Sequence, residues 1–154
     1  MSKSLCAGAR RPSQSEIIHG VLAILRRGDR FLLIQRAAGV RLPGVWCFPG
    51  GQIEPGEAQA EALIREMREE LGIGVEPIRR VMVFEKHGGR LVLNCWTARC
   101  LPGRLRPNAA EVAGARWMTP RQIRSMRLAY RSVPLDGPPR LISGTRRILT
   151  RLGV

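Results

Sequence analysis

The sequence predicts an α/β fold with layers built around a mixed β-sheet. Pairs of apolar stretches with turn residues between them stand before and after one long helical stretch, and two further helical patterns follow near the C-terminus. This alternation is typical of layered α/β domains. The chain of 154 residues is about one domain long. We therefore expect a single domain at residues 16–154, after a basic, polar tail at 1–15 that we expect to be flexible.

The first strand pair is expected at residues 19–25 and 31–35, which are apolar and are separated by Arg27-Gly28-Asp29-Arg30. A short turn between two such runs indicates a β-hairpin. His19 stands at the start of the first run, where we interpret it as a strand-edge residue and not as a ligand. A loop at 36–44 follows, and residues 46–50 then lead through adjacent glycines toward the long helix.

The long helix is expected at residues 58–71, because the stretch follows Pro55-Gly56, contains neither Pro nor Gly, and ends before Gly72. At about 100° per residue, four apolar residues share a side that would pack on the core. These residues are Ala60, Ile64, Met67 and Leu71. On the opposite side we expect a stripe of carboxylates from Glu66, Glu69 and Glu70.

Downstream, residues 81–84 and 91–98 predict a second hairpin around Lys86-His87-Gly88-Gly89. We interpret Trp96 as a core residue and His87 as a turn residue. A long connection at 102–113 carries Glu111, and a strand is expected at 115–118. Thr119 and Gln122 form a capping-box pattern around Pro120, which predicts a helix to about residue 129. A basic helix is expected at 141–152.

Charge is distributed unevenly along this chain. The formal net charge is +14, yet six of the twelve acidic residues stand within residues 51–73. Like charges three and four residues apart each cost a helix a few tenths of a kcal/mol, so a row of carboxylates stabilises nothing unless a cation lies among them. Mg²⁺ takes oxygen ligands and often bridges to phosphates. The plainer alternative is a solvated acidic face in which Arg65 and Arg68 pair with Glu61 and Glu69.

The spacing within residues 51–73 favours the metal-binding interpretation, because it resembles the signature of the Nudix hydrolases. The matching positions are Gly51, five residues, Glu57, seven residues, Arg65-Glu66, apolar Met67, any residue, Glu69-Glu70, any residue, Gly72 and apolar Ile73. The resemblance covers roughly residues 17–123. It implies an α-β-α sandwich around a mixed β-sheet and hydrolysis of a diphosphate linkage.

The resemblance also implies a site. The metal ligands would be the carbonyl of Gly50 with Glu66, Glu69 and Glu70, holding Mg²⁺, for which Mn²⁺ can substitute. Glu66, Glu69 and Glu111 are the candidate catalytic residues, with Glu66 or Glu111 orienting or deprotonating the attacking water. Arg65 is expected to pair with Glu57 and to fix the loop against the helix.

The segments flanking the signature resemble the MutT-type branch. This implies a small-molecule nucleotide substrate, a nucleoside triphosphate such as 8-oxo-dGTP, cleaved to monophosphate and pyrophosphate. A coenzyme A pyrophosphatase motif matches only in part, since Ile34 stands where threonine is expected. The basic surface leaves an RNA 5′-end pyrophosphohydrolase open as an alternative. A third alternative is a non-catalytic regulator that binds nucleotide or RNA.

Other classes find little support in this sequence. The four cysteines form no C-x-x-C pair, which argues against a zinc ribbon or a thioredoxin-like motif. We find neither a secretory signal nor an apolar run long enough to span a bilayer, so we expect no membrane partner and a cytoplasmic location. Neither the base preference nor the oligomeric state follows from the sequence.

Overall fold

A computed structural model describes residues 16–154, so the tail expected at 1–15 lies outside the described residues. The elements in chain order are β1 (Ile18–Arg27), β2 (Arg30–Arg36), β3 (Val45–Cys47), β4 (Gly50–Gln52), α1 (Gln59–Leu71), β5 (Val75–Lys86), β6 (Leu91–Cys100), β7 (Val112–Met118), α2 (Pro120–Ser125), β8 (Arg127–Ala129), β9 (Arg140–Ile142) and α3 (Ser143–Leu152). Within this part of the chain, no helix is long and apolar enough to cross a membrane.

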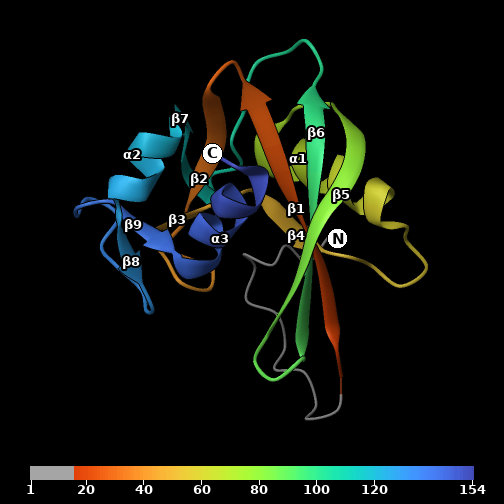
Figure 1. The fold of residues 1–154 in the computed structure, drawn as a ribbon, viewed down its shortest axis with the longest axis horizontal. Coiled ribbons are helices and arrows are strands. Elements are labelled where there is room, and N and C mark those ends of the chain that lie inside the picture. The colour runs from red at the N-terminus through yellow and green to blue at the C-terminus, as the bar shows by residue number, and fades with distance from the viewer. Residues whose placement is uncertain (1–15) are drawn as a thin grey trace.

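The strands form one mixed sheet. Its order in the described chain is β5-β6-β1-β2-β3-β9-β8, with β4 paired to β1 and β7 paired to β2. The pairs β1–β6, β3–β9 and β8–β9 are parallel, and the others are antiparallel. In Figure 1, β1, β5 and β6 run side by side as long strands, while β2, β3, β8 and β9 form a second group. Strand β1 belongs to both groups, because its residues 18–25 pair with β6, residues 20–22 also pair with β4, and its last two residues pair with β2.

A hydrophobic core lies on each face of this sheet. In β1, Val21, Ala23 and Leu25 pack into the core that contains Leu63 and Met67 of α1. Ile24 packs into the other core, which contains Ile148 and Leu149 of α3 and Ile123 of α2. Strands covered on both faces are apolar at consecutive positions. The run at 19–25 therefore reflects two buried faces, and the predicted α/β sandwich around a mixed sheet is confirmed.

Both predicted hairpins are present. The turn at Gly28-Asp29 joins β1 to β2, with Arg27 opposite Arg30. Strands β5 and β6 pair antiparallel around the turn that contains His87, which adopts a left-handed φ of 54°. Strand β5 begins earlier than expected, at Val75. Its register shifts after Pro77, and a proline is tolerated there because β5 is an edge strand.

Helix α1 confirms the predicted long helix, and Met67 and Leu71 lie in the core as expected, with Ile64 packed at its border. The expectation that Glu66 and Glu70 lie on the side away from the core was wrong. The fully buried residues are Ala62, Leu63, Glu66, Met67, Glu70 and Leu71. Ile64 and Ala60, which we had placed in the core, are only half-buried. Glu66 and Glu70 are 0% exposed and lie on the same arc of the helix as Leu63. The positions of apolar residues alone do not predict this buried side of the helix. It carries glutamates as well as apolar residues, because it packs against the glycines of β4 as well as against the core.

Two expectations for the C-terminal region were also wrong. The capping box at Thr119 is present, with the Gln122 N–H 3.2 Å from the Thr119 hydroxyl, but α2 ends at Ser125 because Met126 is extended. Residues 127–129 then form β8. The C-terminal helix begins at Ser143, since residues 140–142 form β9 between β3 and β8. Strands of three residues are stabilised mainly by hydrogen bonds to the neighbouring strands. Their own sequence is therefore too short to predict them.

The burial of α1 gives a test of its corrected orientation. Leu63→Ala should lower the free energy of unfolding by about 2–5 kcal/mol, because it leaves a cavity in a closed core. Ile64→Ala, one position further along the helix, should cost only about 1 kcal/mol. Urea unfolding of both variants measures the difference. A larger loss for Ile64→Ala would contradict the assigned face.

Candidate active site

The centre of the site is the contact between Gly50-Gly51 of β4 and two glutamates of α1. A Cβ atom on Gly51 would lie 1.9 Å from the carboxylate carbon of Glu66, so this carboxylate occupies the place of a side chain at Gly51. The Gly50 N–H donates to Glu70 Oε2 over 3.1 Å. Both carboxylates are therefore packed against the strand backbone. Glycine is required at 51 by the Glu66 carboxylate, whereas a Cβ atom on Gly50 would lie 2.0 Å from the Val21 carbonyl oxygen of β1.

The ladder between β1 and β4 fixes the direction of the Gly50 backbone. Gly50 lies opposite Leu22, and the neighbouring Ala23 N–H donates to the Pro49 carbonyl over 2.8 Å. Opposite residues in an antiparallel ladder alternate between pairs that exchange hydrogen bonds and pairs that do not, so Leu22–Gly50 is a pair that does not. The N–H and carbonyl of Gly50 consequently point away from β1, to the side of Glu70.

Arg65 holds the loop before α1 against the helix. Its guanidinium donates to both carboxylate oxygens of Glu57, over 2.6 and 2.8 Å, and to the Gln52 carbonyl over 2.9 Å. It also reaches Glu66 Oε1 at 2.9 Å and Glu69 Oε2 at 3.3 Å. The bond from Arg65 is the main cause that lowers the pKa of Glu57, and the same bond raises the pKa of Arg65. The expected Arg65–Glu57 pair is confirmed.

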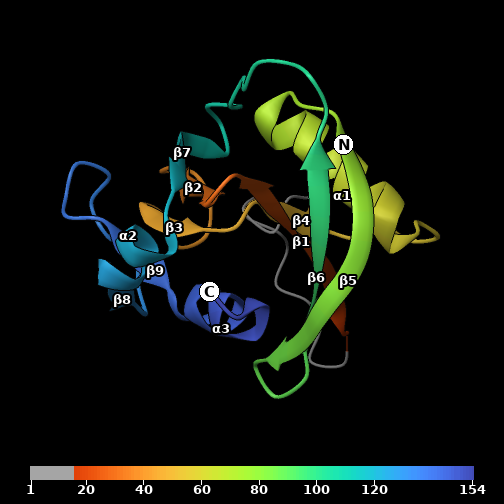
Figure 2. The ribbon, with the colours of Figure 1, turned by 45° about the horizontal axis from the view of Figure 1, so that its top comes forward.

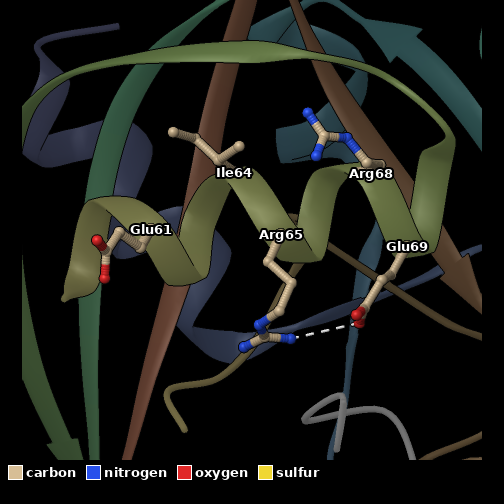
Figure 3. Close-up of a pocket in the computed structure, with 5 residues that line it drawn as sticks. All are labelled: Glu61, Ile64, Arg65, Arg68 and Glu69. Carbon is tan, nitrogen blue, oxygen red and sulfur yellow. Dashed lines mark hydrogen bonds and ion pairs between the residues drawn. The ribbon is translucent and has the colours of Figure 1, made fainter. Parts of the chain in front are cut away.

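The alternative of a simple solvated acidic face is not what the structure shows for α1. Glu66 and Glu70 are fully buried, whereas the Glu69 side chain is 37% exposed and Glu61 is also exposed. Glu61 turns back to accept a hydrogen bond from the Ala58 N–H over 3.0 Å. In Figure 3, Arg65 reaches toward Glu69 below the helix, whereas Ile64 and Arg68 point to the other side; together these residues line a pocket of about 430 Å³.

The carboxylate oxygens of Glu66, Glu69 and Glu70 are of the type that binds a hard divalent cation. In this structure the three side chains form hydrogen bonds with protein groups. Among residues 16–154, no three His, Cys, Asp or Glu side chains already form a metal-binding group. Glu66 and Glu69 are engaged by Arg65, and Glu70 by the Gly50 amide. Two buried carboxylates one turn apart nevertheless repel each other, and oxygen donors of this type suit Mg²⁺ or Mn²⁺.

Glu111 belongs to the loop that packs on the end of α1. The Asn108 N–H donates to the Glu70 carbonyl over 2.8 Å, and the Arg106 N–H donates to the Leu71 carbonyl over 2.7 Å. Glu111 itself is fixed by backbone bonds, its N–H to Asn108 and its carbonyl from the Ala37 N–H. Its Oε2 is buried and accepts no hydrogen bond from any described residue. Sequence reasoning missed this docking, because backbone bonds leave no trace in side-chain identity.

Comparison with known proteins identifies the family. The model of the NUDIX domain matches residues 17–136, which is most of the chain. The chain belongs to the Nudix hydrolase family. A CTP pyrophosphohydrolase from Escherichia coli K12 is 36% identical over 122 residues, covering 78% of this chain and 89% of that protein.

Other members of the Nudix family support the same assignment. A human 8-oxo-dGDP phosphatase is 36% identical over 108 residues, covering 68% of this chain and 33% of that longer protein. The crystal structure of a MutT Nudix hydrolase from Burkholderia pseudomallei superposes with a TM-score of 0.72 at 25% identity, covering 90% of this chain and 99% of that one.

The glycine pair of this Nudix site gives a sharp prediction. Gly51→Ala should lower the free energy of unfolding by about 1–3 kcal/mol, because the methyl group collides with a carboxylate that is buried and cannot swing into solvent. Gly39→Ala is the matched control, since nothing lies within 4 Å of its Cβ position, and it should change stability by less than about 0.5 kcal/mol. Equal effects of the two substitutions in urea unfolding would refute the packing described for Gly51.

Proposed function

We propose that this Nudix hydrolase cleaves a nucleoside triphosphate to monophosphate and pyrophosphate with Mg²⁺, for which Mn²⁺ can substitute. The observation that carries the proposal is the seating of two buried glutamates of α1 against Gly50-Gly51, with Glu69 beside them. In the reaction, water oxygen forms a new bond to phosphorus, the bridging P–O bond breaks, and one proton of the water is removed.

Each part of the site has a role in this proposal. Glu66, Glu69, Glu70 and the Gly50 carbonyl would hold Mg²⁺, which when bound neutralises phosphate charge and makes water a better nucleophile. Glu66 or Glu111 would orient the water and accept its proton. Arg65 would hold Glu66 and Glu69 in place through its bonds to the loop, which is a positioning role.

The relatives narrow the choice of substrates to test. The relative that is 36% identical over 78% of this chain is named for CTP, and others are named for 8-oxo-dGDP, 8-oxo-dGTP and NAD-capped RNA. We therefore place CTP and 8-oxo-dGTP first, with the other nucleotides, coenzyme A, NADH and capped RNA as comparisons. A cytoplasmic location would suit any of these substrates.

The rival from another class is a regulator that binds nucleotide or RNA without cleaving it. Three carboxylates placed together repel phosphate, so they hinder binding unless a cation is held there. Turnover decides between the two. Metal-dependent release of pyrophosphate supports the enzyme, while tight nucleotide binding with no product supports the regulator.

Removal of one proposed ligand gives the main test. Glu70→Gln should lower the rate of pyrophosphate release from the preferred nucleotide by at least about 100-fold. A smaller loss, of about 10–100-fold, is typical when a residue only supports a metal ligand and does not bind the metal itself. Glu76→Gln, an equal change at an exposed residue that pairs with Arg99, should leave the rate within about twofold. A Glu70→Gln enzyme with full activity would eliminate the proposed metal assignment.

Glu111 is tested separately. Glu111→Gln keeps the shape of the side chain and the backbone bonds of its loop, so the protein should fold normally. If Glu111 is the base, kcat should fall about 10²–10⁴-fold while the Mg²⁺ concentration at half-maximal rate stays unchanged. Initial rates over a Mg²⁺ titration measure both. An unchanged kcat would leave Glu66 as the candidate base.

A further inference from the structure

A second group of charged residues, all basic, surrounds the end of β5. It combines Arg36 of β2, Arg41 of the following loop, Lys86 of β5 and Arg147 of α3. Figure 2 shows α3 beside the end of β5. A Cβ atom on Gly144, in the first turn of α3, would lie 3.4 Å from Lys86 Nζ. Arg147 follows one turn later on the same side of the helix.

The loop residue Arg41 is joined to the β5–β6 turn. Arg41 Nη2 lies 3.2 Å from His87 Nε2. A guanidinium can only donate, so His87 Nε2 must accept, and the ring is neutral with its proton on Nδ1. Burial first, and then the charges of Arg41, Lys86 and Arg90, lower the pKa of His87, which agrees with a neutral ring. His87 thus fixes Arg41 without adding charge.

Three cations of this group have no ion-paired carboxylate in the part of the chain that the structure describes. They are Arg41, Lys86 and Arg147. Burial and then the charges of Arg41, Arg147 and Arg36 lower the pKa of Lys86, while the Cys47 thiol opposes them. Cations gathered without a counter-charge repel one another, and an anion bound among them removes the repulsion.

The basic group also borders the glutamates of α1. The buried Cys47 thiol lies within electrostatic range of Arg36, Glu70 and Lys86 at once. Arg41 and Arg147 are exposed and Lys86 is half-buried, so a ligand can reach the group from solvent. The charges converge from three separate segments instead of forming a row. This arrangement suits one compact anion better than the extended backbone of a nucleic acid strand.

We propose that Arg41, Lys86 and Arg147 form a phosphate-binding site beside the glutamate centre, with His87 as the residue that positions Arg41. A phosphate group offers several acceptor oxygens to a guanidinium fork and an ammonium group together. The phosphate is either part of a bound nucleotide or a separate inorganic anion. The site needs no divalent cation and no turnover, so it goes beyond the proposed hydrolytic reaction.

The test is calorimetric binding of inorganic pyrophosphate to the full chain in EDTA. Wild-type protein should bind, and Lys86→Gln and Arg41→Gln should each weaken binding at least about tenfold, as expected for loss of one charge-assisted hydrogen bond. Arg79→Gln is the matched control: it removes the same charge from an exposed residue seven positions earlier, roughly 20 Å along β5. It should change binding less than about twofold.

Two results would overturn the site. One is absence of pyrophosphate binding by the wild-type protein. The other is an equal loss in Arg79→Gln, which would show that only the diffuse positive charge of the surface attracts the anion. His87 has its own test: His87→Leu should weaken binding while His87→Gln, which keeps an acceptor for Arg41, restores it. Equal weakening by both would reject the positioning role.

A kinetic arm distinguishes the two sources of phosphate. With Mg²⁺ and the preferred nucleotide, Lys86→Gln should raise KM at least about tenfold if the substrate's own phosphate occupies the site. An unchanged KM, together with lost pyrophosphate binding, supports a separate anion. If the wild-type protein does not bind pyrophosphate, the phosphate site is refuted but the proposed hydrolysis is not. If the protein binds pyrophosphate but hydrolyses no nucleotide, only the proposed hydrolysis is refuted.

Discussion

The direct contact between the backbone of Gly50-Gly51 and the carboxylates of Glu66 and Glu70 is the constraint on which the rest of the site depends. The missing Cβ at Gly51 leaves the space that the Glu66 carboxylate occupies, and the Gly50 amide binds Glu70. β4 in turn is held by β1, whose central position in the sheet places it between two hydrophobic cores. The position of the glutamates therefore follows from the packing of the whole sheet.

Burial of two carboxylates on one helix requires compensation, because each loses its hydration. Arg65 supplies part of it, since one guanidinium binds the loop carbonyl of Gln52, the carboxylate of Glu57 and two glutamates of α1. A planar fork can bind several oxygens in fixed directions, which a lysine could not do. The same arginine thus reduces repulsion among the acids and ties the loop to the helix.

Sequence reasoning predicted those parts of the candidate site that are local in the chain. Spacing within one helix and one loop predicted Glu66, Glu69, Glu70 and the Arg65–Glu57 pair, although it placed the buried Glu66 and Glu70 on the side away from the core. It could not find β8 or β9, because three-residue strands depend on distant partners. Nor could it find the contact of Arg41 with His87, which joins residues 46 positions apart.

The two charged groups make different demands on an anionic ligand. The glutamate centre repels phosphate until a cation is held there, whereas the basic group attracts phosphate at once. Cys47 lies within electrostatic range of Lys86 and of Glu70, so in the proposed site both groups would act on one ligand. The net charge of +14 adds attraction at long range that salt screens. The diffuse positive charge attracts every polyphosphate alike. Discrimination among polyphosphate ligands must therefore come from the few side chains that contact the ligand directly.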